Sequence, residues 1–253
     1  YYKQKITHRR KKYMSEKMEL LLRRAEAFIA ELEEESYLRN TRIFSDFNMA
    51  VIVGQLENEL EYSHQMKGIN FYRTRVIVER ISKIADCVPV MISETLLRRL
   101  SVQNNELKGK WVKIGGEFRS YDRIGEDGHK YLDLFLFVQY IEFCNEPGEY
   151  VNINLVELEG DICKPAVFRK TPKGTSITDI NIVIKRPYGK SDCIPCITWN
   201  DVAEIASLFG GGERIRIYGR IQSRSYFKRV SPNSEEGIWK TAYEVSVARF
   251  DLI

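Results

Sequence analysis

Apolar and polar residues alternate over many short stretches of this chain, a pattern typical of strands with one buried face. The clearest stretch is 214–226, in which Ile215, Ile217 and Ile221 alternate with charged, polar or aromatic residues. Gly54 lies inside the first predicted strand and suggests a bulge or bend there. A short helix is predicted before the fourth strand of each half of the chain. The other predicted strands are 49–57, 71–78, 86–92, 111–119, 132–143, 154–162, 180–188 and 193–199.

A helical periodicity precedes these strands. From Ser15 to Glu35 the apolar residues recur at i, i+3 and i+4, and Ser15 is a candidate N-cap, so we predict an amphipathic helix. Its apolar stripe requires a partner, which is either the body of the protein or a second copy of the chain. Residues 1–13 are basic and non-periodic. We expect a solvated tail there, with an electrostatic arm for nucleic acid as the alternative.

Several features of the sequence occur twice in nearly the same register. At a spacing of 106 residues these are Gly54 and Gly160, Lys67-Gly68 and Lys173-Gly174, and the Asp-Cys-x-Pro motifs at 86 and 192; at 103, Gly116 and Gly219; at 107, Phe143 and Phe250. When several different features recur at nearly the same spacing, they indicate an internal repeat. The boundary between the two copies is near 145–149.

Each copy has the order strand, hairpin, strand, strand, helix, strand, which is the order of a five-stranded OB-fold barrel. The predicted fold is therefore mainly β, with two tandem OB-fold barrels, each with one short helix, after an N-terminal α-helix. The predicted parts of the chain are an arm and helix over 1–46, a first barrel over 47–147 and a second barrel over 148–253.

The distribution of charge suggests where an anionic partner could bind. The net charge is +3 over residues 1–47, −2 over 48–152 and +3 over 153–253. The five cysteines lack the spacing of a disulfide framework, so a reducing cytoplasm is the expected location. No apolar run approaches the length of about 18 residues that a membrane span needs, and no membrane contact is expected.

Motifs for catalysis or metal binding are weak. Cys193 and Cys196 have the spacing of a zinc or redox pair, but residues three apart on a strand face opposite sides, so we predict structural cysteines. Gly210–Gly212 fits a helix C-cap and turn better than a phosphate loop. The three histidines are scattered along the chain. We therefore expect no enzyme activity, no cofactor, no metal and no small-molecule substrate.

Four segments of the second copy carry a resemblance to a known family. They are Leu-Val-Glu-Leu-Glu-Gly-Asp-Ile at 155–162, Phe-Arg-Lys-Thr-Pro-Lys-Gly at 168–174, Trp-Asn-Asp-Val-Ala-Glu-Ile-Ala at 199–206 and Ile-Tyr-Gly-Arg-Ile-Gln-Ser-Arg-Ser-Tyr at 217–226. Residues 153–253 resemble the DNA-binding domain of the bacterial single-stranded DNA-binding proteins. With the first copy included, the chain is similar to a tandem-barrel variant of that family associated with clostridia-like bacteria.

The resemblance implies stacking of bases on aromatic residues along a basic groove. Carried over position by position, the stacking residues fall on Tyr188, Trp199 and Tyr226. The outward face predicted for 214–226 is basic and aromatic, which suits phosphate contact plus base stacking. A solvated outer strand is the alternative. The basic residues expected at this site are Arg169, Lys173, Arg186, Arg216, Arg220, Arg224, Lys228 and Arg229.

The first copy departs from this pattern, because Ser93 and Arg123 stand at the positions of Trp199 and Tyr226. We interpret it chiefly as a pairing or scaffolding barrel with a degenerate binding face; binding by both copies is the alternative. Ordinary family members are tetramers of single barrels, so the resemblance implies a homodimer with four barrels. The predicted function is sequence-independent binding and protection of single-stranded DNA in replication, recombination or repair. The alternatives are a primosome-like interaction scaffold with weak DNA affinity and an RNA-binding module.

Overall fold

The structure, a computed structural model, describes residues 16–38, 48–100, 107–125, 127–145, 148, 151–186, 189–229 and 236–253, and in the N-terminal helix the side chains of 23–34. That helix is α2 (Glu16–Leu38), as the periodicity predicted. The predicted N-cap Ser15 and the basic stretch 1–13 lie outside the described residues.

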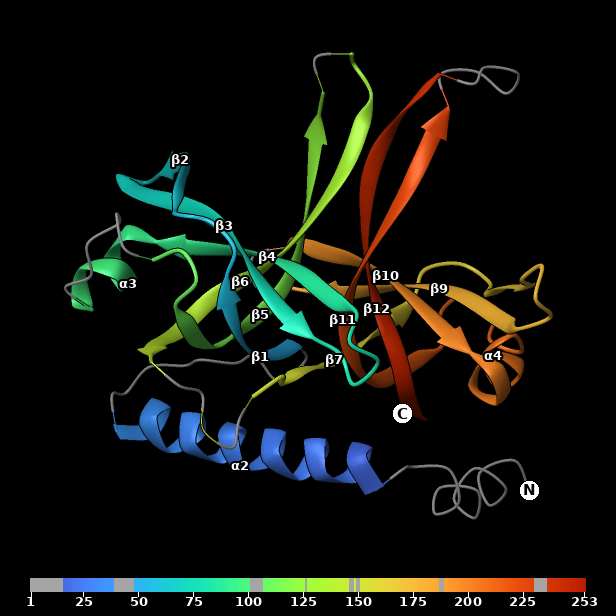
Figure 1. Ribbon diagram of the computed structural model, residues 1–253. Helices are drawn as coiled ribbons and strands as arrows, with labels where there is room; N and C mark the ends of the chain where they lie inside the picture. Colours follow the sequence, from blue (N-terminus) through green and yellow to red (C-terminus); the bar gives the residue numbers. More distant parts are fainter. Residues whose placement is uncertain are drawn as a thin grey trace.

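The predicted fold class is confirmed, because two OB-fold barrels follow the helix and the chain is mainly β (Figure 1). The first barrel contains β1 (Asn48–Leu56), β2 (Glu61–Met66), β3 (Ile69–Glu79), β4 (Ala85–Ser93), α3 (Glu94–Arg99), β5 (Trp111–Ile124) and β6 (Lys130–Cys144). The second contains β7 (Asn154–Ile162), β8 (Val167–Lys170), β9 (Ser176–Lys185), β10 (Ser191–Trp199), α4 (Asn200–Ala206), β11 (Arg214–Arg229) and β12 (Gly237–Leu252). The short strands β2 and β8 are additions to the five predicted per barrel.

Each barrel closes through its first strand. β1 pairs with both β3 and β5, and β4 pairs parallel with β6. β7 pairs with β9 and β11 in the same way, and β10 pairs with β12. A Cβ on Gly54 would lie 2.3 Å from Ile77 O, and a Cβ on Gly160 would lie 2.6 Å from Val183 O. These repeated glycines therefore permit the close crossing at which the first strand changes its partner.

The repeat has a different offset in its last strand from the one predicted. Ile141 of β6 lies opposite Ile114, and Phe250 of β12 lies opposite Ile217. Since Ile114 and Ile217 are 103 residues apart, Phe250 is equivalent to Ile141, at 109 residues, and not to Phe143. The change arises because the β11–β12 hairpin is six residues longer than the β5–β6 hairpin.

The two barrels share one sheet. β1 and β7 pair antiparallel, from Asn48 opposite Leu158 to Ile52 opposite Asn154, and the strand order continues without a break through 12 strands. Around this seam β4 contacts β11 and β10 contacts β5. Since β4 is equivalent to β10 and β5 to β11, the two contacts are equivalent to each other, and the barrels are related by an approximate twofold axis. The β5–β6 and β11–β12 hairpins rise from the same side of the sheet (Figure 1).

Helix α2 lies along the other side of the sheet (Figure 1). Its residues Ala25, Phe28 and Leu32 are at most 2% exposed. They form one cluster with sheet residues that include Val51 and Tyr140. The apolar stripe is thus buried against the body of the protein, one of the two predicted partners. No helix in the described part of the chain has both the length and the apolar character needed to cross a membrane.

Candidate nucleic-acid interface

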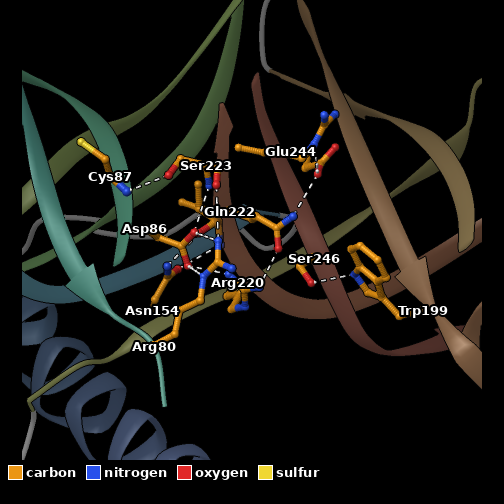
Figure 2. A network of polar contacts seen from close by, with 12 residues as sticks. Arg80, Asp86, Cys87, Asn154, Trp199, Arg220, Gln222, Ser223, Glu244 and Ser246 are labelled. Carbon is orange, nitrogen blue, oxygen red and sulfur yellow. Dashed lines mark hydrogen bonds and ion pairs between the residues drawn. The ribbon is translucent and has the colours of Figure 1, made fainter. Parts of the chain in front are cut away.

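Trp199 is half-buried at the end of β10, directly before α4. Its Nε1 donates a hydrogen bond to Ser246 Oγ of β12 at 3.3 Å (Figure 2). Strand pairing places Arg169 of β8, Ile177 of β9 and Trp199 in one row across the sheet. Because paired residues share a face, the indole and the Arg169 guanidinium project from the same side.

The β11–β12 hairpin adds Arg224 and Tyr226 to this side. Gln222 lies opposite Glu244, and its Nε2 donates to Glu244 Oε1 at 3.0 Å (Figure 2). Arg224 Nε lies 3.7 Å from the same carboxylate oxygen. The Arg224 guanidinium is also 5.8 Å from the centroid of the Tyr226 ring, which is 36% exposed. Glu244, on the same strand as Ser246, therefore bonds β12 to Gln222 and Arg224 of β11.

Arg169 is paired with the carboxylate of Asp179 on the same side of the sheet. Its Nε donates to Asp179 Oδ2 at 2.8 Å. The pKa of Arg169 is raised, first by this hydrogen bond and further by the charges of Asp179 and Glu244, while burial opposes the shift. The surface formed here is named the second-barrel face below; it consists of Arg169, Asp179, Trp199, Arg224, Tyr226, Glu244 and Ser246. It combines two aromatic rings with two arginines, each of which already has a carboxylate partner.

Arg220, predicted at this site, lies instead at the junction of the two barrels. Its Nη1 donates to Asp86 of β4, whose side chain is 1% exposed (Figure 2). Arg80 binds the same carboxylate, with Nε 2.8 Å from Oδ2, and Ser223 N donates to Oδ1 at 3.0 Å. Burial lowers the pKa of Arg220, although the charge of Asp86 opposes this. Arg220 therefore bonds the second barrel to the first.

An equivalent junction involves Arg186. Asp192 of β10 accepts a hydrogen bond from Ser120 N of β5 at 2.7 Å, and Ser120 Oγ accepts one from Cys193 N at 2.8 Å. Arg186 Nε lies 3.0 Å from Asp192 Oδ2, but the two atoms lack hydrogen-bond geometry. Burial raises the pKa of Asp192 despite these partners. The ion pair at this junction is therefore weaker than the one at the first.

Arg216 projects from the side of the sheet that carries α2. It lies opposite Glu159 of β7 and donates to that carboxylate from Nε at 3.1 Å and from Nη2 at 2.7 Å. These bonds raise the pKa of Arg216. Along the 16 residues of β11, Arg216, Arg220 and Arg224 thus meet three different surroundings. The predicted alternation is present, but the single basic face predicted for 214–226 is not.

The remaining predicted residues are dispersed. Lys173 is exposed in the turn between β8 and β9, and Lys228 and Arg229 are exposed at the end of β11. Tyr188 lies outside the described residues. Sequence reasoning missed Trp239, which is 73% exposed on β12, and it missed Ser246 and Glu244 on the same strand. The alternation of apolar and polar residues over 239–247 marks that strand.

The cysteines lie as predicted for structural residues. Cys193 is half-buried and Cys196 is 3% exposed, on opposite sides of β10. Burial raises the pKa of both thiols, which disfavours the thiolate needed for redox or metal chemistry. Burial is also the main reason that the pKa of Cys87 is raised to about 11. Within the described ranges, no group of three His, Cys, Asp or Glu side chains could hold a metal ion.

Sequence comparison matches the second barrel. Residues 153–253 fit the model of the single-strand binding protein family. A single-stranded DNA-binding protein of Oceanobacillus iheyensis is 31% identical over 81 residues, which cover 29% of this chain and 50% of that protein. A single-stranded DNA-binding protein of Clostridium tetani is 36% identical over 81 residues, which cover 29% of this chain and 56% of that protein. The chain spans about half the length of these curated relatives.

Structure comparison extends over both barrels. The crystal structure of the wild-type single-stranded DNA binding protein from Thermus aquaticus covers 81% of this chain and 92% of its own, with a TM-score of 0.62. Its sequence is 16% identical, so this likeness shows the fold. The similarity in sequence to the single-strand binding protein family thus covers the second barrel, the part of the chain on which Trp199, Arg224 and Tyr226 share one face.

Proposed function

We propose that the chain binds and protects single-stranded DNA without sequence preference and without catalysis, in the cytoplasm, during replication, recombination or repair. The observation that carries the proposal is the second-barrel face, where Trp199 and Tyr226 lie on a surface flanked by Arg169 and Arg224. Stacking tolerates any sequence because every base has a π face, and it contributes about 1–3 kcal/mol per base. The family match and the names of the relatives support the same function.

Phosphate capture depends on which cations are available. Arg169 and Arg224 are paired with Asp179 and Glu244. Phosphate contacts from these arginines therefore require an exchange of partners. In the described part of the chain, three exposed cations of the predicted set have no ion pair, namely Lys173, Lys228 and Arg229. We infer that these three make the first contacts with the backbone of the strand.

The salt dependence of binding tests this mechanism. Titration of the intact chain with oligo-dT at several salt concentrations is expected to give a slope of log affinity against log salt of about −2, for three neutralised phosphates on a single strand. Lys173→Gln is expected to make the slope less negative by about 0.7. Lys83→Gln, which changes an exposed lysine of the first barrel, is the control. A slope of zero contradicts electrostatic capture, whereas a slope beyond about −4 shows that the paired arginines also exchange partners.

The same titration separates the alternative functions. Matched DNA and RNA oligonucleotides are compared at low salt, with duplex DNA as the control for strand preference. A higher affinity for RNA would favour an RNA-binding module. If neither strand binds while the chain retains a protein partner in a pull-down, an interaction scaffold is favoured. The net charge of −2 over 48–152 is the feature that motivates this second outcome.

A homodimer with four barrels completes the proposal. The sheet side that carries α2 also presents an uncovered ladder in which Glu159 binds Arg214 and Arg216. A second copy could meet this ladder charge to charge, since α2 already covers the apolar centre of the sheet. Light scattering is expected to give twice the mass of one chain at low salt and a lower mass at high salt, where exposed charges are screened. A single-chain mass at every salt concentration would contradict the dimer.

A further inference from the structure

In the first barrel, aromatic rings lie next to Ser93, the residue that stands at the position of Trp199 in the second barrel. In this barrel the row equivalent to that of Trp199 consists of His64, Phe71 and Ser93. Paired residues share a face, so His64 and Phe71 lie on the side of the first barrel that corresponds to the second-barrel face. The serine at position 93 is therefore not evidence that this side lacks rings.

β6 supplies a further ring beside Ser93. The parallel pairing of β4 with β6, and of β10 with β12, makes Phe137 equivalent to Ser246. In the second barrel Trp199 bonds to Ser246. In the first barrel the aromatic residue and the serine have exchanged strands, because Ser93 and Phe137 occupy the corresponding places.

These side chains form a continuous row. The ring of His64 is stacked on Phe71 with centroids 5.0 Å apart and planes 8° apart. The centroids of Phe71 and Phe137 are 6.0 Å apart, and the Arg119 guanidinium lies 4.1 Å from the Phe137 centroid. Arg119 also donates to Glu117 at 2.9 and 2.7 Å. The four side chains His64, Phe71, Phe137 and Arg119 are named the first-barrel row below.

The β5–β6 hairpin extends this row with Tyr121, which is 61% exposed. It stands two residues beyond Arg119 on the same strand and so faces the same side. At the equivalent positions the second hairpin has Arg224 followed by Tyr226, whereas the first has Tyr121 followed by Arg123. The aromatic residue and the arginine have exchanged places here as well.

The two hairpins connect the two faces. They rise side by side (Figure 1), and Lys240 of β12 lies 5.0 Å from the centroid of the Tyr131 ring of β6. Lys240 is the ladder partner of Tyr226, which belongs to the second-barrel face. A nucleic-acid strand that stacks on Tyr226 of one hairpin therefore lies next to the other hairpin, which carries Tyr121.

We propose that the first barrel has its own site for single-stranded nucleic acid, in which bases stack on Tyr121 and on the two rings of the first-barrel row that are not buried, those of His64 and Phe137. The proposal rests on the proposed function of the second barrel and extends it to the barrel with the degenerate sequence. Binding is weaker there, because Phe71 is only 5% exposed and Arg119 is committed to Glu117.

The test counts oligonucleotides bound per chain. An oligo-dT of about eight nucleotides fits a single OB fold, so calorimetric titration of the intact chain is expected to show two sites of unequal affinity. Tyr121→Ala is expected to weaken the weaker site about 5- to 150-fold, the range for one lost stacked base, and to leave the tighter site unchanged. Tyr121→Phe keeps the ring and is expected to retain both sites.

Ile124→Ala is the matched control, since Ile124 is 71% exposed on the same hairpin and faces its other side. Two unchanged sites in Tyr121→Ala, or a single oligonucleotide per intact chain, would overturn the second site while the proposed function stands. Equal weakening by Ile124→Ala would overturn the assignment to this side of the hairpin. An intact chain that binds no oligonucleotide would overturn the proposed function itself.

Discussion

Replacing Asp86 with Ala is expected to lower the free energy of unfolding by about 3 kcal/mol. The carboxylate is buried between the barrels and binds both Arg80 and Arg220. Breaking a buried ion pair by removing one partner costs about 3–5 kcal/mol, because the remaining charge is left without a counter-charge. The lower end applies here, since the side chains of Arg80 and Arg220 are 21% and 30% exposed. Chemical denaturation followed by circular dichroism measures the change.

The equivalent change, Asp192→Ala, is the matched control. Asp192 is as buried as Asp86, but its one arginine, Arg186, lacks hydrogen-bond geometry. The free energy of unfolding is expected to fall by about 1–3 kcal/mol, because Ser120 N loses its acceptor. The loss is smaller than for Asp86, because the substitution also removes a buried carboxylate whose arginine partner is poorly placed. Equal losses in the two variants would contradict the stronger bonding that we assign to Arg220.

The interface between the barrels shows what sequence reasoning could and could not predict. Asp86 and Arg220 are 134 residues apart, and no local pattern marks them as partners. The alternation in 214–226 predicted correctly that the side chains of Arg216 and Arg220 point out of the barrel interior. It could not predict what lies outside, because a sheet twists and a long strand passes several neighbours. Arg220 was predicted to contact nucleic acid, but in the structure it binds Asp86 between the barrels, so we expect its loss to affect stability more than binding.

The first barrel shows a second limit of sequence comparison. A position-by-position comparison follows the chain, so it finds Ser93 at the place of Trp199. A binding face is built across strands, and a ring from β6 can stand beside a serine on β4, as Phe137 does. The repeat itself was readable because Gly54 and Gly160 are fixed by close backbone contacts at the strand crossing. Residues that the backbone geometry requires, such as these glycines, therefore recur at a fixed spacing in the sequence. Residues of a binding face can come from different strands, so they need not recur at that spacing.

Replacing Trp199 with Ala is expected to weaken the tighter binding of a short oligo-dT about 5- to 150-fold. The indole is the largest ring of the second-barrel face, and one stacked base contributes about 1–3 kcal/mol. Trp199→Phe keeps an aromatic platform and is expected to lose much less. Ser246→Ala removes only the acceptor of the indole N–H and is expected to have a small effect. The anisotropy of a labelled oligonucleotide measures all three variants without relying on the tryptophan that has been removed.

The intrinsic fluorescence of Trp199→Ala then shows where a longer strand lies. The remaining tryptophans differ in their surroundings, because Trp111 packs against the cluster under α2 and Trp239 is 73% exposed on the β11–β12 hairpin. Quenching that persists with a longer oligo-dT therefore reports contact with Trp239, on the hairpin that leads toward the first barrel. If Trp199→Ala binds the short oligonucleotide as tightly as the intact chain does, base stacking on the second-barrel face is wrong. A weakening that Trp199→Phe does not restore, in a variant with unchanged unfolding, would show that the indole acts through its hydrogen bond or its shape and not as a stacking platform.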